Sequence, residues 1–274
     1  MHPKLDLPLL GIVSSHDFFV VAAVLAAGTF GFLNTVWREE LPAGRVFAAL
    51  LCLCVIVFAG GRLHFALTKW QMFEHDPWRV LRISSGGLHA PGAILALVLG
   101  GLPALRWLRL PIGRFVDGLA PAVPIGIVFA RVGCLLNGCC YGAVCDLPWG
   151  VTLPRESYTW YAQIEYGKIG HDAATTLPIH PLPAYFVLAA LSITAFLLWL
   201  RPRRRYEGQL GLWLLFLFSL SSTLLEPLRA HHETRVYWAG QPQLFWISLG
   251  MTLLGIALLV VAHRRTQVAQ PRTD

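Results

Sequence analysis

Seven apolar stretches, each about 20 residues long, divide this sequence and constrain its fold more than any other feature. They run roughly over residues 16–37, 44–67, 86–105, 116–136, 182–200, 208–228 and 243–263. Such a stretch predicts a transmembrane helix, because a helix satisfies all of its own backbone hydrogen bonds. Only 14% of the residues are charged, against about a quarter in soluble proteins. We therefore predict an all-α polytopic membrane protein with seven transmembrane helices in a single domain, residues 1–274.

The distribution of basic residues predicts the orientation. Twelve of the 22 Lys and Arg residues fall in alternate short loops and at the C-terminal end: Arg38, Arg45, Arg106, Arg109, Arg114, Arg201, Arg203, Arg204, Arg205, Arg264, Arg265 and Arg272. Basic loops stay in the cytoplasm. We therefore expect the N-terminus outside, the C-terminus in the cytoplasm and one large external loop at about 137–181. The net charge of +7 is then explained without nucleic-acid binding. The start of the chain lacks the pattern of a cleaved signal peptide, so the first span is expected to remain.

Four of the six cysteines gather at the predicted external end of the fourth span: Cys134, Cys139, Cys140 and Cys145. That compartment is oxidising, so one disulfide is plausible. Their spacing, C-x4-C-C-x4-C, matches no common zinc pattern. We therefore expect no metal and no organic cofactor. The other two, Cys52 and Cys54, lie within the second span and are interpreted as small apolar residues.

Ionisable residues occur at the predicted external ends of several spans. They are Arg62, His89, Arg131, His180, Glu226 and Arg229. Such residues are costly in a membrane and indicate a functional site unless they form structural pairs. Arg62 can alternatively reach the surface, and Glu226 and Arg229 can pair at a spacing of three. Their shared depth predicts a polar cavity that opens to the outer leaflet.

The strongest local pattern runs from Arg131 to Gly142. Helical spacing puts Arg131 and Cys134 on one face, with Asn137 or Gly138 one turn further on. A guanidinium can bind a phosphate through two hydrogen bonds, so this end of the span suits an anionic headgroup. At the third span, Gly86, Gly87 and Pro91 interrupt the helix beside His89, the best-placed proton acceptor.

These patterns together resemble the prolipoprotein diacylglyceryl transferase family over nearly the whole chain. The motifs that carry the resemblance are Gly61-Arg62-Leu63, Gly86-Gly87-Leu88 with Gly92-Ala93, Asp117 with Pro121, Arg131 to Gly142, His180-Pro181 with Tyr185, and Glu226 with Arg229. The chain departs from the family motifs at His16 (a tyrosine in the family), Pro91 (a histidine), Cys134 (an asparagine), Cys139 (a glutamate) and Ser222 (an arginine).

The resemblance implies transfer of a diacylglyceryl group from phosphatidylglycerol to the lipobox cysteine thiol of a prolipoprotein, in the bacterial cytoplasmic (inner) membrane. It suggests Arg131, His89 and Glu226 as catalytic residues, with Arg131 on the phosphate and His89, or less favourably His16 or His180, as the base. The expected substrate-binding residues are Arg62, Gly133, Asn137, Gly138, Gly142, Arg229 and His180. No cofactor is implied, the expected partners are phosphatidylglycerol, the lipobox segment and membrane lipids, and a monomer is the default.

Two alternatives stay open. The departures cluster at the implied active site, so the acceptor can differ from a lipobox cysteine. The chain can also be a non-catalytic lipid-binding or thiol-redox membrane protein whose working part is the external cysteines.

Overall fold

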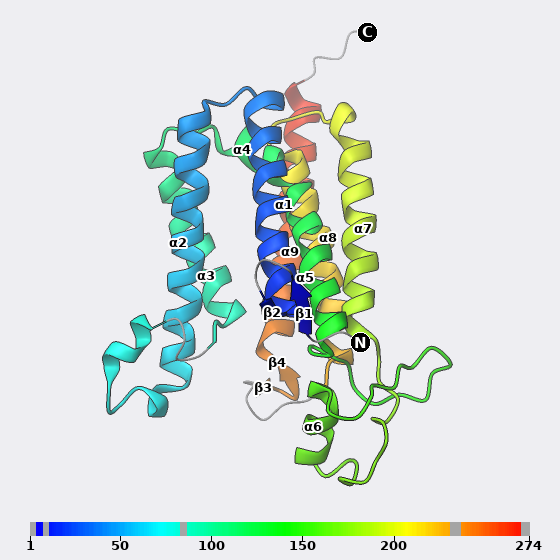
Figure 1. Ribbon diagram of the computed structural model, residues 1–274. Coiled ribbons are helices and arrows are strands. Elements are labelled where there is room, and N and C mark those ends of the chain that lie inside the picture. Colours follow the sequence, from blue (N-terminus) through cyan, green and yellow to red (C-terminus); the bar gives the residue numbers. More distant parts are fainter. Residues whose placement is uncertain (1–3, 8–10, 83–86, 231–236, 270–274) are drawn as a thin grey trace. The chain divides into compact units, whose positions relative to one another are not determined.

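A computed structural model describes residues 4–7, 11–82, 87–230 and 237–269, and it confirms the membrane-spanning pattern (Figure 1). Within these residues, seven helical segments are long and apolar enough to cross a membrane. They are α1 (Ser15–Arg38), α2 (Ala43–Thr68), α3 (Ala90–Trp107), α4 (Ile112–Leu119) with α5 (Ala122–Asn137), α7 (Leu182–Leu200), α8 (Gln209–Leu225) and α9 (Gln243–Ala269). The chain is an all-α, multi-pass membrane protein.

Two span boundaries differ from the prediction. The third span begins at Ala90 rather than at residue 86, with His89 as its N-cap and Pro91 in its first turn, where a missing N–H costs nothing. The fourth span consists of two helices, α4 and α5, with a turn at Ala120 and Pro121 between them. Proline cannot donate a backbone hydrogen bond, which favours the break at this point.

Short elements lie between and beside the spans. An antiparallel hairpin, β1 (Lys4–Leu7) and β2 (Gly11–Ser14), pairs Lys4 with Ser14, and a smaller one pairs β3 (Tyr237–Trp238) with β4 (Gln241–Pro242). The loop 137–181 contains α6 (Tyr158–Glu165). The 3-10 turns are η1 (Trp70–Met72), η2 (Pro77–Leu81), η4 (Arg201–Arg203) and η5 (Glu226–Leu228). The sequence analysis predicted the loop 137–181 but did not predict these strands, α6 or the 3-10 turns.

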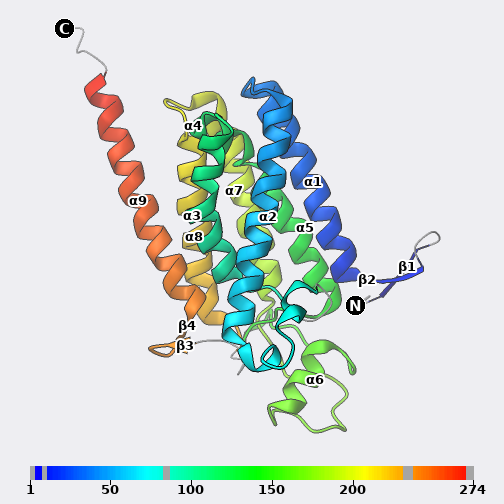
Figure 2. The ribbon, with the colours of Figure 1, turned by 90° about the vertical axis from the view of Figure 1, so that its left-hand side faces the viewer.

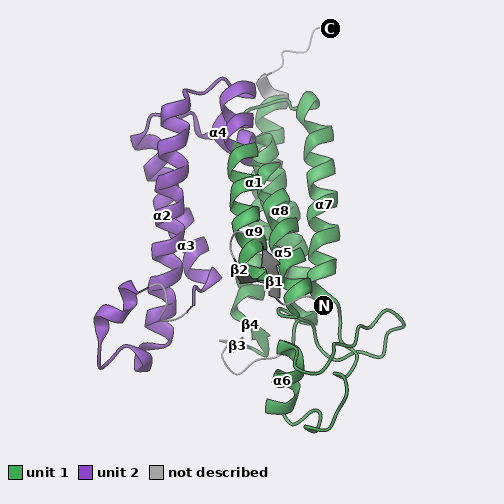
Figure 3. Ribbon diagram, in the orientation of Figure 1, with its two compact units in different colours: residues 1–31, 120–274 green, residues 32–119 purple. Residues whose placement is uncertain are grey.

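The chain divides into two compact units, shown in different colours in Figure 3. Unit 1 comprises residues 1–31 and 120–274, and unit 2 comprises residues 32–119. The assignment of residues 1–274 to one functional domain stays a prediction.

Unit 1 is a helical bundle in which α7 packs against both α5 and α8, and α8 packs against α9 (Figures 1 and 2). Its buried core contains Ile193, Leu197 and Leu210. A second cluster, which includes Tyr141, Leu153 and Ile179, holds the loop 137–181 together.

Unit 2 is centred on the pair α2 and α3, with a core that includes Val46, Leu105 and Phe115. The two helices approach closely because Gly60 and Gly92 face each other's backbone: a Cβ at Gly60 would lie 2.7 Å from the carbonyl oxygen of Gly92. A Cβ at Gly92 would collide with Gly60 O and with the Cβ of His64.

This contact gives a test of the packing in unit 2. Gly92→Ala is expected to destabilise the protein by about 1–3 kcal/mol, because overpacking has to be relieved by moving one helix. The matched control is Gly28→Ala in α1, where a Cβ meets nothing within 4 Å. That change is expected to be neutral or to stabilise by up to about 1 kcal/mol through helix propensity. Thermal unfolding in detergent measures both, and equal melting temperatures for the two variants would contradict the packing.

Candidate functional site

The end of α5 turns sharply in a way that gathers three cysteines in unit 1. Gly138 has a positive φ of 70°, and Cys140 follows with a φ of 58°. The N–H groups of Gly138 and Cys139 both donate to the carbonyl oxygen of Cys134. These two N–H groups are therefore used within the turn, and substrate binding at Gly138 stays a prediction.

Helix α1 runs antiparallel to α5 and approaches it where α5 has glycines. A Cβ at Gly133 would lie 2.7 Å from the Cβ of Phe19 and 3.4 Å from the Cα of His16. Gly126, which lies nearer the start of α5 than Gly133, approaches Ala27 of α1 in the same way. The glycine at 133 thus allows the first turn of α1 to bring His16 to the cysteine turn.

The thiols at this turn interact with one another. Cys140 is hydrogen-bonded to Cys134 and Cys139, and the side chain of Asn137 reaches the Cys139 thiol. The hydrogen bonds from the two thiols and the charges of Arg131 and Arg229 lower the pKa of Cys140. All six cysteines, including Cys145, are free thiols. The turn therefore favours a thiolate at Cys140 rather than an inert buried thiol.

Two guanidinium groups meet beside this turn. Arg131 from α5 lies over the ring of Phe186 in α7 at 4.5 Å from the centroid, and Arg229 lies 5.9 Å from the same centroid. Nε of Arg229 is 3.1 Å from the Glu226 carboxylate, and both side chains are buried. The predicted pair at a spacing of three is confirmed.

Arg131 differs from Arg229 in having no partner for its polar atoms. Among the described residues, no hydrogen-bond acceptor or carboxylate is paired with its guanidinium, which lies over the Phe186 ring and close enough to Cys140 to act on that thiol electrostatically. Because Glu226 neutralises Arg229, the net positive charge of the pair of arginines resides on Arg131. A half-buried guanidinium without a carboxylate partner has N–H donors with which it can bind an anion.

The segment after the turn fixes the position of Arg229 and His180. Gly142 N–H donates to His180 O, and Ala143 N–H donates to Leu228 O, so residues 141–143 lie between the two other segments. A Cβ at Gly142 would lie 2.5 Å from the Cβ of His180. Only glycine allows this three-segment arrangement.

His180 is held by an aromatic hydrogen-bond chain. Its Nδ1 is 3.4 Å from the hydroxyl of Tyr185, which also accepts a 2.8 Å bond from Trp149 Nε1. A cavity of about 60 Å³ is bordered by His180, Cys134 and Cys139.

Unit 2 contains the other two predicted residues. Arg62 donates to four backbone carbonyl oxygens, those of Arg79, Val80, Arg82 and Gly87, at 2.7–3.2 Å. These bonds support a structural role in holding the connection between α2 and α3. Binding of a headgroup by Arg62 stays a prediction.

His89 lies at the start of α3 in a cluster with His64 and Thr68. Its Nδ1 is 3.3 Å from His64 Nδ1 and 3.0 Å from Thr68 Oγ1. Burial, together with the charges of His64 and Lys69, lowers the pKa of His89, so the neutral imidazole that can accept a proton is favoured. The neighbouring Ser84, Ser85 and Gly86 lie outside the described residues.

Unit 1 therefore contains most of the predicted site: Arg131, Gly133, Asn137, Gly138, Gly142, His180, Glu226 and Arg229. Sequence reasoning missed the roles of Phe186, whose ring joins two arginines, and of His64 beside His89. It also missed the approach of His16 to Cys134 and Cys139. The spacing along one helix carries no signal for contacts of this kind, which come from packing between helices.

Comparison with known proteins shows the family to which the chain belongs. The relatives include three proteins named phosphatidylglycerol–prolipoprotein diacylglyceryl transferase. The protein from Mannheimia succiniciproducens is 29% identical over 90% of this chain and 85% of its own length. The protein from Clostridium perfringens, whose name carries the number 2, is 24% identical over 90% of each chain. The protein from Paracidovorax citrulli is 27% identical over 97% of this chain and 98% of its own. The family model for prolipoprotein diacylglyceryl transferase matches residues 11–261, which is most of the chain, and the chain therefore belongs to that family.

Proposed function

We propose that this protein transfers the diacylglyceryl group of phosphatidylglycerol to the lipobox cysteine thiol of a prolipoprotein. The single observation that carries the proposal is the unpaired guanidinium of Arg131, held beside the neutralised Arg229 at the end of a membrane-spanning helix. The family match and the names of the relatives support the same activity.

The reaction needs a cation at the leaving phosphate. Charge develops on the phosphate oxygens as the carbon–oxygen bond breaks, and a preorganised guanidinium stabilises this charge strongly where water is excluded. Arg131 can offer two parallel N–H donors to two phosphate oxygens. The proposed role of Glu226 is to keep Arg229 in place and neutral as a pair, so that the phosphate is attracted to Arg131.

Polar groups around Arg131 complete the headgroup site in this proposal. Asn137 lies two turns after Arg131 near the end of α5, and its amide orients the headgroup while it contacts Cys139. His180 borders the small cavity at the cysteine turn. His89 is proposed as the base for the acceptor thiol, since its neutral form is favoured.

The proposed setting is the bacterial cytoplasmic membrane, with the N-terminus and the loop 137–181 on the outer side. The protein is proposed to act as a monomer on phosphatidylglycerol and the lipobox segment, with membrane lipids around its exposed apolar faces. Side chains such as Leu25, Leu99 and Leu188 are more than half exposed on the spans, as lipid-facing positions require.

The first prediction concerns Arg131. Arg131→Ala is expected to lower transfer at least about 100-fold, because a transition-state donor is lost. Arg131→Lys keeps the charge without the two-pronged donor, so it is expected to lower transfer about 10-fold. The assay combines purified protein, phosphatidylglycerol and a lipobox peptide in liposomes, and mass spectrometry measures the peptide that carries diacylglyceryl.

Arg155→Ala is the matched control, since Arg155 is exposed in the loop and its guanidinium, like that of Arg131, lies over an aromatic ring, at 5.5 Å from the centroid of Trp160. This variant is expected to transfer at the wild-type rate. Full activity of Arg131→Ala would contradict the assignment. A wild-type protein that is folded and inserted but gives no product would contradict the proposed function itself.

The second prediction concerns the buried pair. Glu226→Gln leaves the Arg229 guanidinium buried without a countercharge, which typically destabilises a protein by about 3–5 kcal/mol. Thermal unfolding in detergent is expected to show a clear loss of stability. The exposed Glu165 in α6 supplies the control, and Glu165→Gln is expected to leave the melting temperature unchanged. A Glu226→Gln protein as stable as the wild type would show that Arg229 does not depend on this carboxylate.

A further inference from the structure

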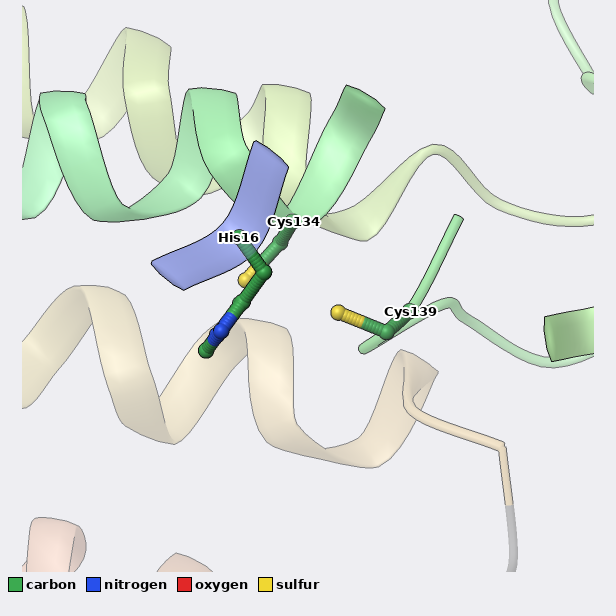
Figure 4. Close-up of side chains that lie close together, drawn as sticks. All are labelled: His16, Cys134 and Cys139. Carbon is green, nitrogen blue, oxygen red and sulfur yellow. The ribbon is translucent and has the colours of Figure 1, made fainter. Parts of the chain in front are cut away.

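Three metal-binding side chains converge at the cysteine turn of unit 1. A ring nitrogen of His16 and the Sγ atoms of Cys134 and Cys139 all lie within 4.8 Å of one another. Figure 4 shows the Cys139 sulfur directed toward the other two residues. Donors of a tetrahedral zinc ion lie about 3.6–3.8 Å apart, given zinc–sulfur bonds of about 2.3 Å. Small side-chain rotations are sufficient to close the set around one ion.

The three residues come from two different elements. His16 is in the first turn of α1, Cys134 is in the last turn of α5, and Cys139 follows the Gly138 turn. The close approach at Gly133 brings the first turn of α1 to α5. All three are among the five positions at which this chain departs from the family motifs quoted above, and at each of the three the chain has a residue that can bind a metal.

The donor set suits a soft cation with one ligand position left open. Two thiolates and one imidazole are the protein ligands of some catalytic zinc sites, in which a fourth position takes water or substrate. His16 Nδ1 is 3.3 Å from the Asp17 carboxylate, a partner of the kind that orients a zinc-bound histidine. Cys140 contacts Cys134 and Cys139 but is not part of the three-donor group. Three donors leave one of the four tetrahedral positions for a further ligand, and Cys140, which contacts two of the three donors, competes for it with an exogenous thiol.

We propose that His16, Cys134 and Cys139 bind a zinc ion whose open position receives the acceptor thiol. This inference rests on the proposed function, because the thiol is the lipobox cysteine. Zinc binds the acceptor sulfur as a thiolate, and the thiol proton passes to water, so the direct proton transfer to His89 proposed above is not required when zinc is bound. The sulfur then attacks the glyceryl carbon that bears the phosphate ester. A carbon–sulfur bond forms, the carbon–oxygen bond breaks, and the electron pair leaves with glycerol phosphate, next to Arg131. Zinc keeps its oxidation state.

The proposed zinc site explains how the chain can activate a thiol although it lacks the family residues at positions 16, 134 and 139. A zinc-bound thiolate remains nucleophilic at neutral pH without a dedicated base beside it. The thioether product is a weaker ligand than the thiolate, because it carries no negative charge. Product release from zinc is therefore favoured over retention.

The first arm of the test measures metal binding without reference to activity. The full-length protein is purified in detergent under reducing, oxygen-free conditions, stripped with a chelator and titrated with zinc or cobalt. We expect about one ion per chain, with cobalt–thiolate charge-transfer absorption from two sulfurs. Cys134→Ser, Cys139→Ser and His16→Gln are each expected to weaken zinc binding at least about 100-fold.

The matched controls are residues of the same types outside the three-donor group. Cys145→Ser and His171→Gln, both in the loop 137–181, are expected to bind zinc as the wild type does. His16→Gln is expected to fold normally, because His16 is only partly buried, so a loss of zinc binding in this variant is not explained by misfolding. Equal zinc affinity in all five variants would overturn the proposal. A Cys140→Ser variant that loses zinc would indicate a closed, four-ligand site and would overturn the open position.

The second arm tests the open position directly. Adding a lipobox peptide to the cobalt-loaded protein is expected to increase the thiolate absorption by about half, as a third sulfur binds. A peptide with serine in place of the cysteine is expected to leave the spectrum unchanged. A spectrum that does not respond to the cysteine peptide would overturn the proposal.

The third arm separates this inference from the proposed function. The stripped wild-type protein is expected to transfer at least about 10-fold more slowly and to recover when zinc is restored. Undiminished transfer without metal would overturn the zinc role and leave the proposed function intact. Zinc and peptide binding without transfer in any state would overturn the proposed function. Thiol counting on protein taken directly from membranes adds one check: a Cys134–Cys139 disulfide in most molecules would overturn the zinc site.

Discussion

The absence of water in the membrane core controls how each buried guanidinium in this protein is used. An unpaired polar group in hydrocarbon is costly, so each arginine in a span must find a partner or mark a ligand site. Arg62 is saturated by backbone carbonyls, and Arg229 is paired with Glu226. Arg131 has only an aromatic ring beneath it among the described residues. The same physical rule thus separates two structural arginines from one that is available to a phosphate.

Close helix contacts set the chemistry at the cysteine turn. The glycine at position 133 allows α1 to approach α5, and the left-handed Gly138 reverses the chain directly after the helix. Without the first feature His16 would stand away from Cys134, and without the second Cys139 would continue along the helix axis. Two glycines therefore determine which donors meet, although neither carries a functional group.

The sequence predicted the spans well because a run of apolar residues is a local signal that the bilayer enforces. It also identified Arg131, Glu226 and Arg229, since charge in a span is conspicuous in the sequence itself. It could not identify the contacts of Arg62, whose partners lie 17 to 25 residues away in the connection between α2 and α3. It also could not show that the backbone N–H of Gly138, a predicted substrate-binding residue, is used within the turn itself. Local patterns specify which residues are unusual, whereas packing decides what each one contacts.

The cysteine spacing shows this limit most clearly. C-x4-C-C-x4-C matches no common zinc pattern, and a search among the cysteines alone therefore argues against a metal. The third donor, His16, lies at the start of the first span, whereas Cys134 lies at the end of the fourth. The two become neighbours only through the α1–α5 contact. A ligand set of this kind is defined by a helix pair rather than by a loop. Its proposed chemistry also follows from that placement. The three donors gather at the end of α5, the helix that also carries Arg131, so the attacking sulfur and the leaving phosphate would be bound at the same end of one helix.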